Sequence, residues 1–211
     1  MRCFASAIVA AAALAFGGHA QAQVVFTEWA YQGGGSEFIE FTNRGASAVS
    51  LAGWSFDDDG RTPGSFDLSS LGSLAAGESA VITDLPTAGA FRTEWGLPSW
   101  VKVIAGNVNN LSRADEINLY NGLALVDRLT YGDQTFPGTI RTNVASGIPS
   151  SPAALGANDV ALWQLAAVGD QFGSYASASG GIGNPGSVPE PASLTMGALA
   201  ALLALKLRKR G

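Results

Sequence analysis

The segment Ser36-Glu37-Phe38-Ile39-Glu40-Phe41-Thr42-Asn43 decides the fold of this chain. Successive side chains of a β-strand point to opposite faces of the sheet. Apolar residues occupy both faces here, because Phe38 alternates with Ile39 and Phe41. A strand that is apolar on both faces belongs inside a sandwich and not at its rim. The segment therefore predicts an interior strand over Glu37–Thr42.

Short β-rich runs continue on both sides of this segment, and no long helical stripe occurs between Gln23 and Gly186. Glycine, asparagine and aspartate separate the runs, as is typical of turns. Seven or eight strands over about 160 residues predict an all-β domain, a two-sheet immunoglobulin-like β-sandwich over residues 23–186. The predicted strands are Val24–Trp29, Glu37–Thr42, Trp54–Asp57, Glu78–Thr83, Val101–Ile104, Glu116–Leu119 and Leu125–Tyr131, with a weaker one near Val160–Leu165.

Local signals add a hairpin and a helix to this outline. Asn121-Gly122 lies between two predicted strands and predicts a tight hairpin with both residues at positive φ. A short helix is predicted over Ala88–Trp95, ended by Gly96 and Pro98. The predicted core residues are Trp54, Phe56, Phe38, Leu119, Val126 and Leu129.

Three polar or flexible residues are interpreted as structural. Gly53 lets the chain turn before Trp54 enters the core. Asn43 caps a turn through its own backbone. Glu40 is either a surface carboxylate or a group that ties a neighbouring loop by accepting backbone N–H bonds.

Residues 1–22 predict a signal peptide for secretion. Arg2 supplies a positive charge, Phe4–Phe16 is apolar, and Ala20-Gln21-Ala22 has the small-x-small pattern that signal peptidase needs. We expect cleavage between Ala22 and Gln23. The alternative is an N-terminal membrane anchor, which the short apolar run disfavours because crossing the hydrocarbon core takes about 20 helical residues.

Cleavage at this point would remove the only cysteine, Cys3, and the only histidine, His19. The mature chain would then have no disulfide, no thiol nucleophile and no imidazole base. The sequence between Gln23 and Ser187 holds seven Lys or Arg against sixteen Asp or Glu, a net charge of −9. A domain this acidic repels phosphate backbones, so nucleic acid is not an expected partner. Divalent cations or neutral polymers fit the charge better.

A sorting tail is predicted over residues 187–211. A proline-punctuated linker is followed by fourteen uncharged residues, Ala192–Leu205, which would span ~21 Å as a helix. With the Lys206 side chain reaching toward the interface and Leu207 extending the apolar face, a transmembrane helix is predicted over 192–207. The basic end should stay cytoplasmic and comprises Lys206, Arg208, Lys209 and Arg210.

The order of motif, short apolar helix and basic end resembles the PEP-CTERM sorting signal of Gram-negative bacteria. The resemblance covers Val188 to Arg210, and the motif itself is Val188, Pro189, Glu190 and Pro191. It implies that a membrane-embedded exosortase cuts near this motif and passes the protein to the cell surface or matrix. A permanent tail anchor is the alternative.

A second resemblance covers most of Val24–Gly186. Phe26-Thr27-Glu28-Trp29, the segment 36–43 and Val49-Ser50-Leu51-Ala52-Gly53-Trp54 together look like the opening of the lamin tail domain. Later matches are Leu74-Ala75-Ala76-Gly77-Glu78, the hairpin 115–133 and the exit Gly183-Asn184-Pro185-Gly186. The sequence departs from the family between Thr135 and Gly173. The resemblance implies a sandwich of the lamin-tail type.

Three candidate chemistries remain open. Asp57, Asp58 and Asp59, followed by Gly60, either bind Ca²⁺ or form a solvated acidic turn. Trp95 and Trp100 flank a loop and either form a sugar-stacking platform or pack in the core. A hydrolytic carboxylate pair would have to be drawn from Glu94, Asp115, Glu116, Asp127 and Asp133.

The favoured interpretation is a non-enzymatic structural or interaction module without a cofactor. It would be exported, anchored transiently in the inner membrane through its C-terminal helix, and released to the cell surface or the extracellular matrix. Its expected partners are signal peptidase, an exosortase-type enzyme and extracellular polysaccharide. The alternative is a carbohydrate- or calcium-dependent adhesion domain.

Overall fold

The structure is a computed structural model that describes residues 23–132 and 140–187. The predicted signal peptide, the sorting tail beyond residue 187 and Asp133 lie outside these ranges. Within the two described ranges, no helix is both long and apolar enough to cross a membrane. The strands are β1 (Val24–Ala30), β2 (Phe38–Asn43), β3 (Val49–Ser50), β4 (Trp54–Asp57), β5 (Phe66–Asp67), β6 (Ser73–Leu74), β7 (Ser79–Thr83), β8 (Lys102–Ala105), β9 (Asp115–Asn121), β10 (Ala124–Tyr131), β11 (Gly147–Pro149), β12 (Trp163–Leu165), β13 (Tyr175–Ala176) and β14 (Ile182–Gly183).

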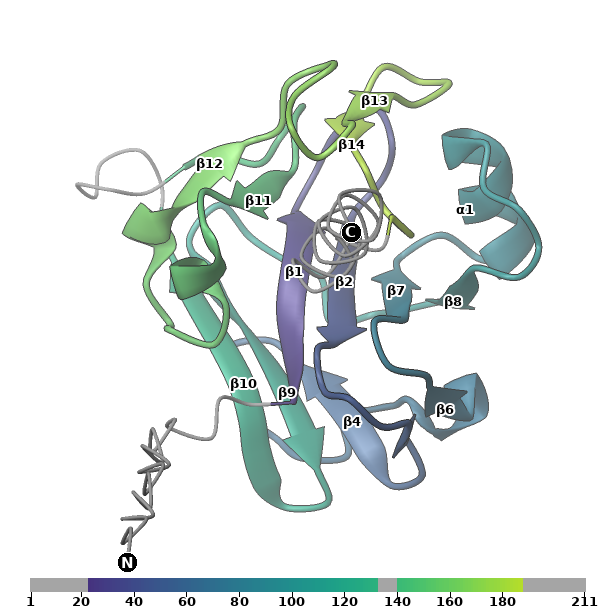
Figure 1. Cartoon of the computed structure of the whole chain (residues 1–211), viewed down its shortest axis with the longest axis vertical. Helices are drawn as coiled ribbons and strands as arrows, with labels where there is room; N and C mark the ends of the chain where they lie inside the picture. Colours follow the sequence, from purple (N-terminus) through teal and green to yellow (C-terminus); the bar gives the residue numbers. More distant parts are fainter. Residues whose placement is uncertain (1–22, 133–139, 188–211) are drawn as a thin grey trace, which may run out of the picture.

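Two sheets contain most of these strands (Figure 1). The larger sheet has the order β12-β11-β1-β2-β7-β8, and the smaller sheet has the order β10-β9-β4-β5. Neighbouring strands are antiparallel except β7 and β8, which are parallel. The helix α1 (Ala88–Trp95) makes the crossover between those two strands. The described residues are therefore mostly β-structure, consistent with the predicted immunoglobulin-like sandwich.

The main core lies between the two sheets. Residues of β1 and β2 that point one way, such as Trp29 and Ile39, pack in one cluster with residues of the smaller sheet such as Phe56 and Leu119. Five of the six predicted core residues are buried, and Val126 is partly buried against this cluster. Burying each large apolar side chain contributes about 1.5–3 kcal/mol, so this layer holds the sandwich together.

The opposite face of the larger sheet is also covered. Phe38 points away from the main core and packs against Phe91 and Trp95 of α1 in a second cluster. The helix begins after Thr87, whose hydroxyl accepts the Ala90 N–H at 3.1 Å, and ends at Gly96 in the left-handed conformation. Burial on both faces explains the apolar residues at successive positions of β2 and confirms its prediction as an interior strand.

The predicted strand near Val160–Leu165 is half correct. Val160–Leu162 forms a short 3₁₀ turn, and only β12 is extended. Asp159 starts the turn by accepting the Ala161 N–H at 3.0 Å. That local side-chain bond competes with the sheet ladder, so the strand begins three residues late.

The hairpin forms as predicted, but its two central residues are not Asn121 and Gly122. Asn121 pairs with Ala124 and belongs to the ladder, so the central residues are Gly122 and Leu123. Of the two predicted residues, only Gly122 has a positive φ, at 58°. Glycine at the first central position is the requirement of a II′ hairpin.

Strand β10 forms an outer edge of the smaller sheet, and side chains cap part of that edge. The Arg128 N–H donates to the carboxylate of Asp127 at 2.8 Å, and the Thr130 N–H donates to the Asn158 side chain at 2.7 Å. The other Asp127 oxygen accepts the Phe26 N–H of β1 at 2.8 Å. One carboxylate therefore clamps β1 to the edge of the opposite sheet.

Asn43, at the end of β2, organises the loops at one end of the sandwich. It is fully buried. Its Oδ1 accepts the Gly45 N–H at 3.0 Å, as the predicted turn cap requires. Its Nδ2 donates to the carbonyls of Ser47, Leu74 and Ala75 at 2.8–3.0 Å. One amide thus joins two loops that are about thirty residues apart in sequence.

We expect Asn43→Ala to lower the free energy of unfolding by about 2–4 kcal/mol, because the substitution leaves buried carbonyl groups without donors. Urea unfolding followed by tryptophan fluorescence measures the change. Asn110→Ala is the matched control, since Asn110 is exposed, and its effect should stay within about 0.5 kcal/mol. Equal stability of the two variants would contradict the assigned role of Asn43.

Candidate functional site

Two carboxylates occupy the covered face of the larger sheet. Glu28 of β1 and Glu40 of β2 are direct cross-strand partners, so their side chains project from the same face. Only 1% of Glu28 and 2% of Glu40 is exposed. Carboxylates this deeply buried need hydrogen-bond donors, and the identity of these donors defines the site.

Two of the four donors come from the last described segment of the chain, residues 182–187, which we call the strap. Glu28 Oε1 accepts the Asn184 N–H at 2.9 Å and a short hydrogen bond from the Ser146 hydroxyl. Glu40 Oε2 accepts the Gly186 N–H at 2.6 Å, and its Oε1 accepts the Thr27 hydroxyl at 2.6 Å. The two carboxylates therefore fasten the strap across β1 and β2, which confirms the loop-tying interpretation of Glu40.

Burial shifts the ionisation of both groups. Desolvation raises the pKa of Glu40 from 4.5 to about 7, although the bonds from Thr27 and Gly186 oppose the shift. Desolvation and then the nearby charge of Glu40 raise the pKa of Glu28 well above its ordinary value. Glu28 Oε2 is buried and accepts no hydrogen bond from the described residues. A protonated Glu28 suits this environment, since a neutral carboxyl group tolerates burial better than a carboxylate.

Glycoside hydrolases also use two neighbouring carboxyl groups, so the geometry of Glu28 and Glu40 has to be compared with that of a catalytic pair. A general acid or base must reach the proton that it transfers. Glu28 lies beneath the strap, and both oxygens of Glu40 are engaged by Thr27 and Gly186. The geometry therefore suits fastening and not proton transfer to a substrate.

The carboxylates that were predicted as candidates for hydrolysis have structural partners as well. Glu116 pairs with Arg61 at 2.8 Å and with Arg128 at 3.0 Å. Glu94 accepts the Ser179 N–H at 2.7 Å, Asp115 accepts the Ser112 N–H at 2.7 Å, and Asp127 clamps β1 as described above. Glu94 lies on α1, Asp115 and Glu116 on β9, and Asp127 on β10, and none of them lines a described pocket.

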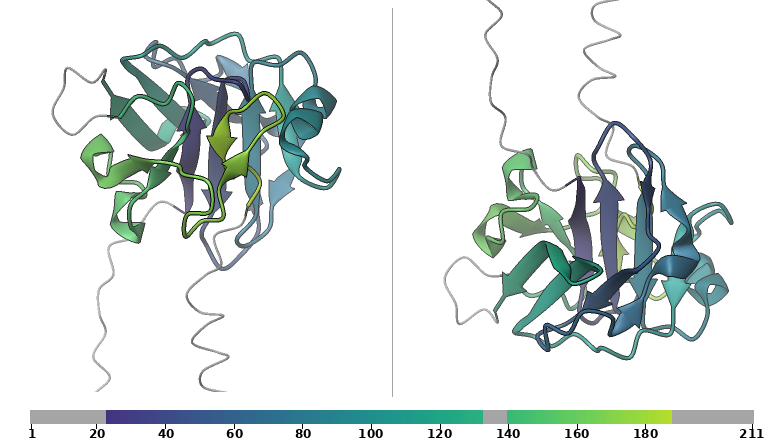
Figure 2. Two further views of the ribbon diagram at one scale, coloured as in Figure 1. Left: turned by 90° about the horizontal axis from the view of Figure 1, so that it is seen from above. Right: turned by 90° about the horizontal axis from the view of Figure 1, so that it is seen from below.

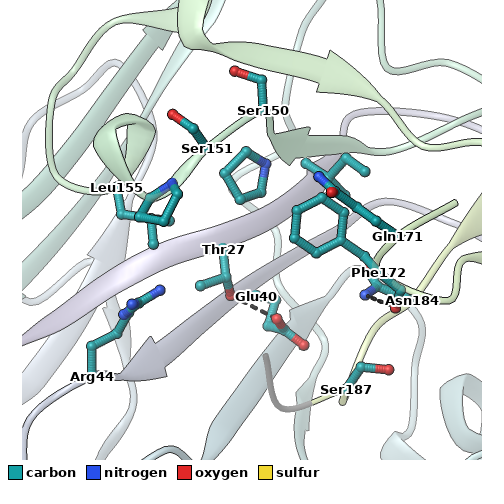
Figure 3. Close-up of a pocket in the computed structure, with 13 residues that line it drawn as sticks. Thr27, Glu40, Arg44, Ser150, Ser151, Leu155, Gln171, Phe172, Asn184 and Ser187 are labelled. Atoms are coloured by element: carbon teal, nitrogen blue, oxygen red, sulfur yellow. Dashed lines mark hydrogen bonds between the residues drawn. The ribbon is translucent and has the colours of Figure 1, made fainter. Parts of the chain in front are cut away.

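A groove runs beside the strap (Figure 3). One hollow of about 550 Å³ has Thr27 and Glu40 on its floor, between the Arg44 side chain and the Phe172 ring. A second hollow of about 500 Å³ shares Arg44, Pro152 and Leu155 with the first. We call the two together the strap groove; its other lining residues are Gln23, Val25, Gly45, Ala46, Ser47, Ile148, Pro149, Ser150, Ser151, Gln171, Asn184 and Ser187.

The two sides of the strap groove differ in chemistry. Arg44 is exposed, and among the described residues its guanidinium makes neither an ion pair nor a hydrogen bond. Phe172 on the other side is half-buried and packs against a small cluster that includes Ile148. Its carbonyl accepts the Asn184 side chain at 3.0 Å, which fixes it relative to the strap. The groove thus combines a cation, an aromatic ring and exposed hydroxyl groups such as that of Ser151.

The predicted calcium ligands form a hydrogen-bonded turn. Asp57 is buried, and its Oδ2 accepts the Thr62 N–H at 2.6 Å. Asp58 accepts the Gly60 N–H at 3.2 Å, and Asp59 is exposed. Throughout residues 23–132 and 140–187, no group of three or more acidic, histidine or cysteine side chains is placed to hold a metal ion. The structure therefore gives Asp57, Asp58 and Asp59 no shared ligand geometry.

Of the two alternatives for Trp95 and Trp100, the structure contradicts the shared platform and shows core packing for Trp95. Only 3% of Trp95 is exposed, and its indole N–H donates to the Gly35 carbonyl at 3.0 Å. Trp100 is 71% exposed. One ring therefore belongs to the core beneath α1, and the two cannot offer a common face to a sugar.

Most predicted sorting residues lie outside the described ranges. These are Ala20, Ala22, Val188, Pro189, Glu190, Pro191, Lys206, Arg208, Lys209 and Arg210. Gln23 is described: its carbonyl accepts the Arg44 N–H at 2.6 Å, and its side chain donates to the Ser47 carbonyl at 3.2 Å. The first described residue is thus anchored at the end of the strap groove.

Glu28, Arg44 and Phe172 were not predicted from the sequence as residues of a site. A usable signal existed for Glu28, because a single carboxylate stands among the apolar residues of Val24–Ala30. Such a residue must be paired or neutral once the strand is buried on both faces. Phe172 lies in the stretch that departs from the family pattern, and Arg44 in a turn, so neither had a periodic context.

We expect Glu40→Gln to remove part of the pH dependence of stability. The folded domain retains a proton on Glu40 up to about pH 7, whereas the unfolded chain releases it near 4.5. The stabilisation that this proton provides is complete below pH 4.5 and is lost as the pH rises through 7. Glutamine cannot ionise, and its amide can accept from Gly186 and donate to Thr27. The variant should match the wild type near pH 4.5 and exceed it by roughly 2–3 kcal/mol at pH 8.

Urea unfolding between pH 4.5 and pH 8.5 provides this measurement. The exposed Asp59→Asn is the control for loss of one negative charge, and it should keep the wild-type slope. Parallel pH profiles for Glu40→Gln and the wild type would contradict the assigned ionisation of Glu40.

Comparison with known proteins places the domain in a family. No curated protein and no solved structure matches the chain. The Lamin Tail Domain family matches residues 18–133, which contain β1 to β10. The later correspondence up to Gly186 lies outside the matched range and stays a prediction. Because the match covers more than half of the 211 residues, the chain belongs to the lamin tail domain family.

Proposed function

We propose that this chain is an exported, non-catalytic interaction module that is displayed at the cell surface or in the extracellular matrix. The observation that carries the proposal is the order of three segments in the sequence. A signal-like segment with Ala20-Gln21-Ala22 precedes the domain, and the tail with Val188-Pro189-Glu190-Pro191 follows it. The first segment has the features of a secretion signal, and the basic end of the tail favours the cytoplasmic side of the membrane. Both predict the same topology, with the domain outside and the basic end inside.

The positions of the domain ends support this proposal. Gln23 bonds to the backbone of Arg44, and Ser187 lines the same hollow as Arg44. The first and last described residues therefore lie near each other, and Figure 2 shows both ends of the coloured domain on one side. The two flanking segments are therefore attached to the same side of the domain.

The non-catalytic part of the proposal rests on how the acids are used. Glu28 and Glu40 fasten the strap, Asp127 clamps β1, and Glu116 holds two arginines. Each of these carboxyl groups has a structural partner, which favours an interaction role over hydrolysis.

The finer proposal concerns processing. Signal peptidase would cut after Ala22, and the helix predicted over 192–207 would hold the chain transiently in the inner membrane. An exosortase-type enzyme would then cut near Val188–Pro191, as the PEP-CTERM resemblance implies. A carbohydrate-dependent adhesion domain is the second candidate, and the strap groove is the observation that favours it.

Mass spectrometry of both chain ends after fractionation of an exosortase-bearing Gram-negative host tests the processing. We expect the surface fraction to begin at Gln23 and to lack Arg208–Arg210. Cytosolic protein that retains Cys3 and His19 would overturn the proposal. An intact basic end in the surface fraction would overturn tail removal and establish a permanent anchor.

Two substitutions separate the cleavage events. Ala22→Tyr removes the small residue before the predicted cut and should leave precursor in the membrane fraction. Glu190→Gln alters the sorting motif and should reduce tail removal at least tenfold while the N-terminus is still processed. Asp59→Asn is the matched acid-to-amide control and should be processed like the wild type.

A further inference from the structure

The strap groove consists of two joined hollows above a floor of paired strands. Its two hollows, of about 550 and 500 Å³, join at Arg44, Pro152 and Leu155. Each alone has the size of a small-molecule site, and together they fit several units of a polymer. The floor consists of β1 and β2, two strands in the interior of the larger sheet. Such a floor changes little on binding, so the groove is preformed.

The net charge of the domain disfavours phosphate backbones, but a single local cation in the groove selects a different kind of ligand. The domain between Gln23 and Ser187 has a net charge of −9, and its cations are mostly engaged. Arg61 and Arg128 pair with Glu116, Lys102 pairs with Glu78, and Arg92 donates to the Val101 carbonyl. Arg44, by contrast, presents a guanidinium to the groove without a described partner. A guanidinium forms paired hydrogen bonds with a carboxylate, so a ligand with carboxylate groups fits this position.

The opposite side of the groove fits a sugar ring. The Phe172 ring faces the interior of the hollow in Figure 3, and Pro149 adds apolar surface beside it. The Phe172 N–H donates to Asp170 at 2.9 Å, which helps to hold the residue in place. An aromatic face packs against the C–H face of a sugar, and the exposed side chains of Ser151 and Gln171 can bond its hydroxyl groups.

The groove does not suit a peptide that binds as an added strand. That mode needs the free backbone groups of a sheet edge. Here β2 is paired on both sides, with β1 and β7. β1 pairs with β2 along its length and with β11 at Trp29 and Gly147, and its Phe26 N–H is taken by the Asp127 carboxylate. Recognition must therefore use side chains, which favours a ligand rich in hydroxyl groups and carboxylates.

We propose that the strap groove binds an acidic polysaccharide, with Arg44 receiving the carboxylate of a uronic acid unit and Phe172 packing on the ring of a sugar in the same chain. The inference deepens the proposed function, on which it rests for a setting in which such a polymer is available. It places the ligand-binding surface on the side of the domain where the first and last described residues lie.

Glu40 on the groove floor gives the binding a pH dependence. Its pKa of about 7 means that a negative charge appears on the floor above neutral pH. The carboxylates of uronic acids remain ionised throughout this range. The increase in repulsion above neutral pH therefore comes from the ionisation of Glu40. Glu40 lies beside Glu28, and the other titratable groups near these two acids are Asp170 and Tyr175. Burial and then the charges of Glu28 and Glu40 raise the pKa of Tyr175 to about 12, so it stays neutral.

Isothermal titration of the full chain in detergent with polygalacturonate tests the proposal, with dextran as the neutral polymer of comparison. We expect binding of polygalacturonate, a severalfold loss of affinity between pH 5.5 and pH 8.5, and little binding of dextran. Arg44→Ala should weaken binding at least tenfold, and Arg44→Lys should recover part of it. Arg113→Ala is the matched control, because Arg113 is exposed and does not line the groove, and it should bind like the wild type.

Phe172→Leu tests the aromatic contact and should weaken binding severalfold while an apolar side chain is kept in the cluster. If this variant unfolds, the exposed Arg44 still provides the decisive comparison. Equal affinity of Arg44→Ala and Arg113→Ala overturns the proposal, as does the absence of heat with millimolar uronate units. Correct processing without polygalacturonate binding would reject this inference and leave the proposed function standing.

Discussion

The burial of two carboxyl groups side by side is the constraint on which one whole layer of this domain depends. Glu28 and Glu40 cannot both be ionised and left without donors on a covered sheet. The chain meets this requirement by laying the strap across β1 and β2, with the N–H groups of Asn184 and Gly186 aimed at the two acids. The strap in turn forms one boundary of the groove. The strap that supplies donors to the two acids therefore also shapes the surface beside it.

Both faces of the larger sheet carry side chains that have to be covered from solvent. One face packs on the smaller sheet, and the other carries Phe38, Glu28 and Glu40. Helix α1 covers the aromatic part of this second face, and the strap covers the acidic part. Beside the strap, the surface between Arg44 and Phe172 stays hollow. A groove at this place follows from incomplete coverage of a two-sided sheet.

The sequence predicted the strands and the family well, because alternation, turn residues and family motifs are local signals. The strand Trp54–Asp57 and the helix Ala88–Trp95 have the predicted bounds. The site could not be predicted in the same way, because Glu28 and Gly183–Gly186 are more than 150 residues apart and meet only after folding. Phe172 lies in no recognisable hydrophobic pattern. The hydrogen bond from buried Trp95 to the distant Gly35 carbonyl forms only after folding. Contacts between remote segments carry no periodicity that a sequence can show.

The capped edge of β10 has a consequence for how copies of this chain behave when they are crowded together. Unpaired backbone groups on an outer strand are a template on which another copy can add its own strand. The side chains of Asp127 and Asn158 already occupy two of these groups, on Arg128 and Thr130. Neighbouring copies are thus discouraged from joining their sheets into fibres. Crowded molecules can remain individually folded, and each can keep its own groove open to the surroundings.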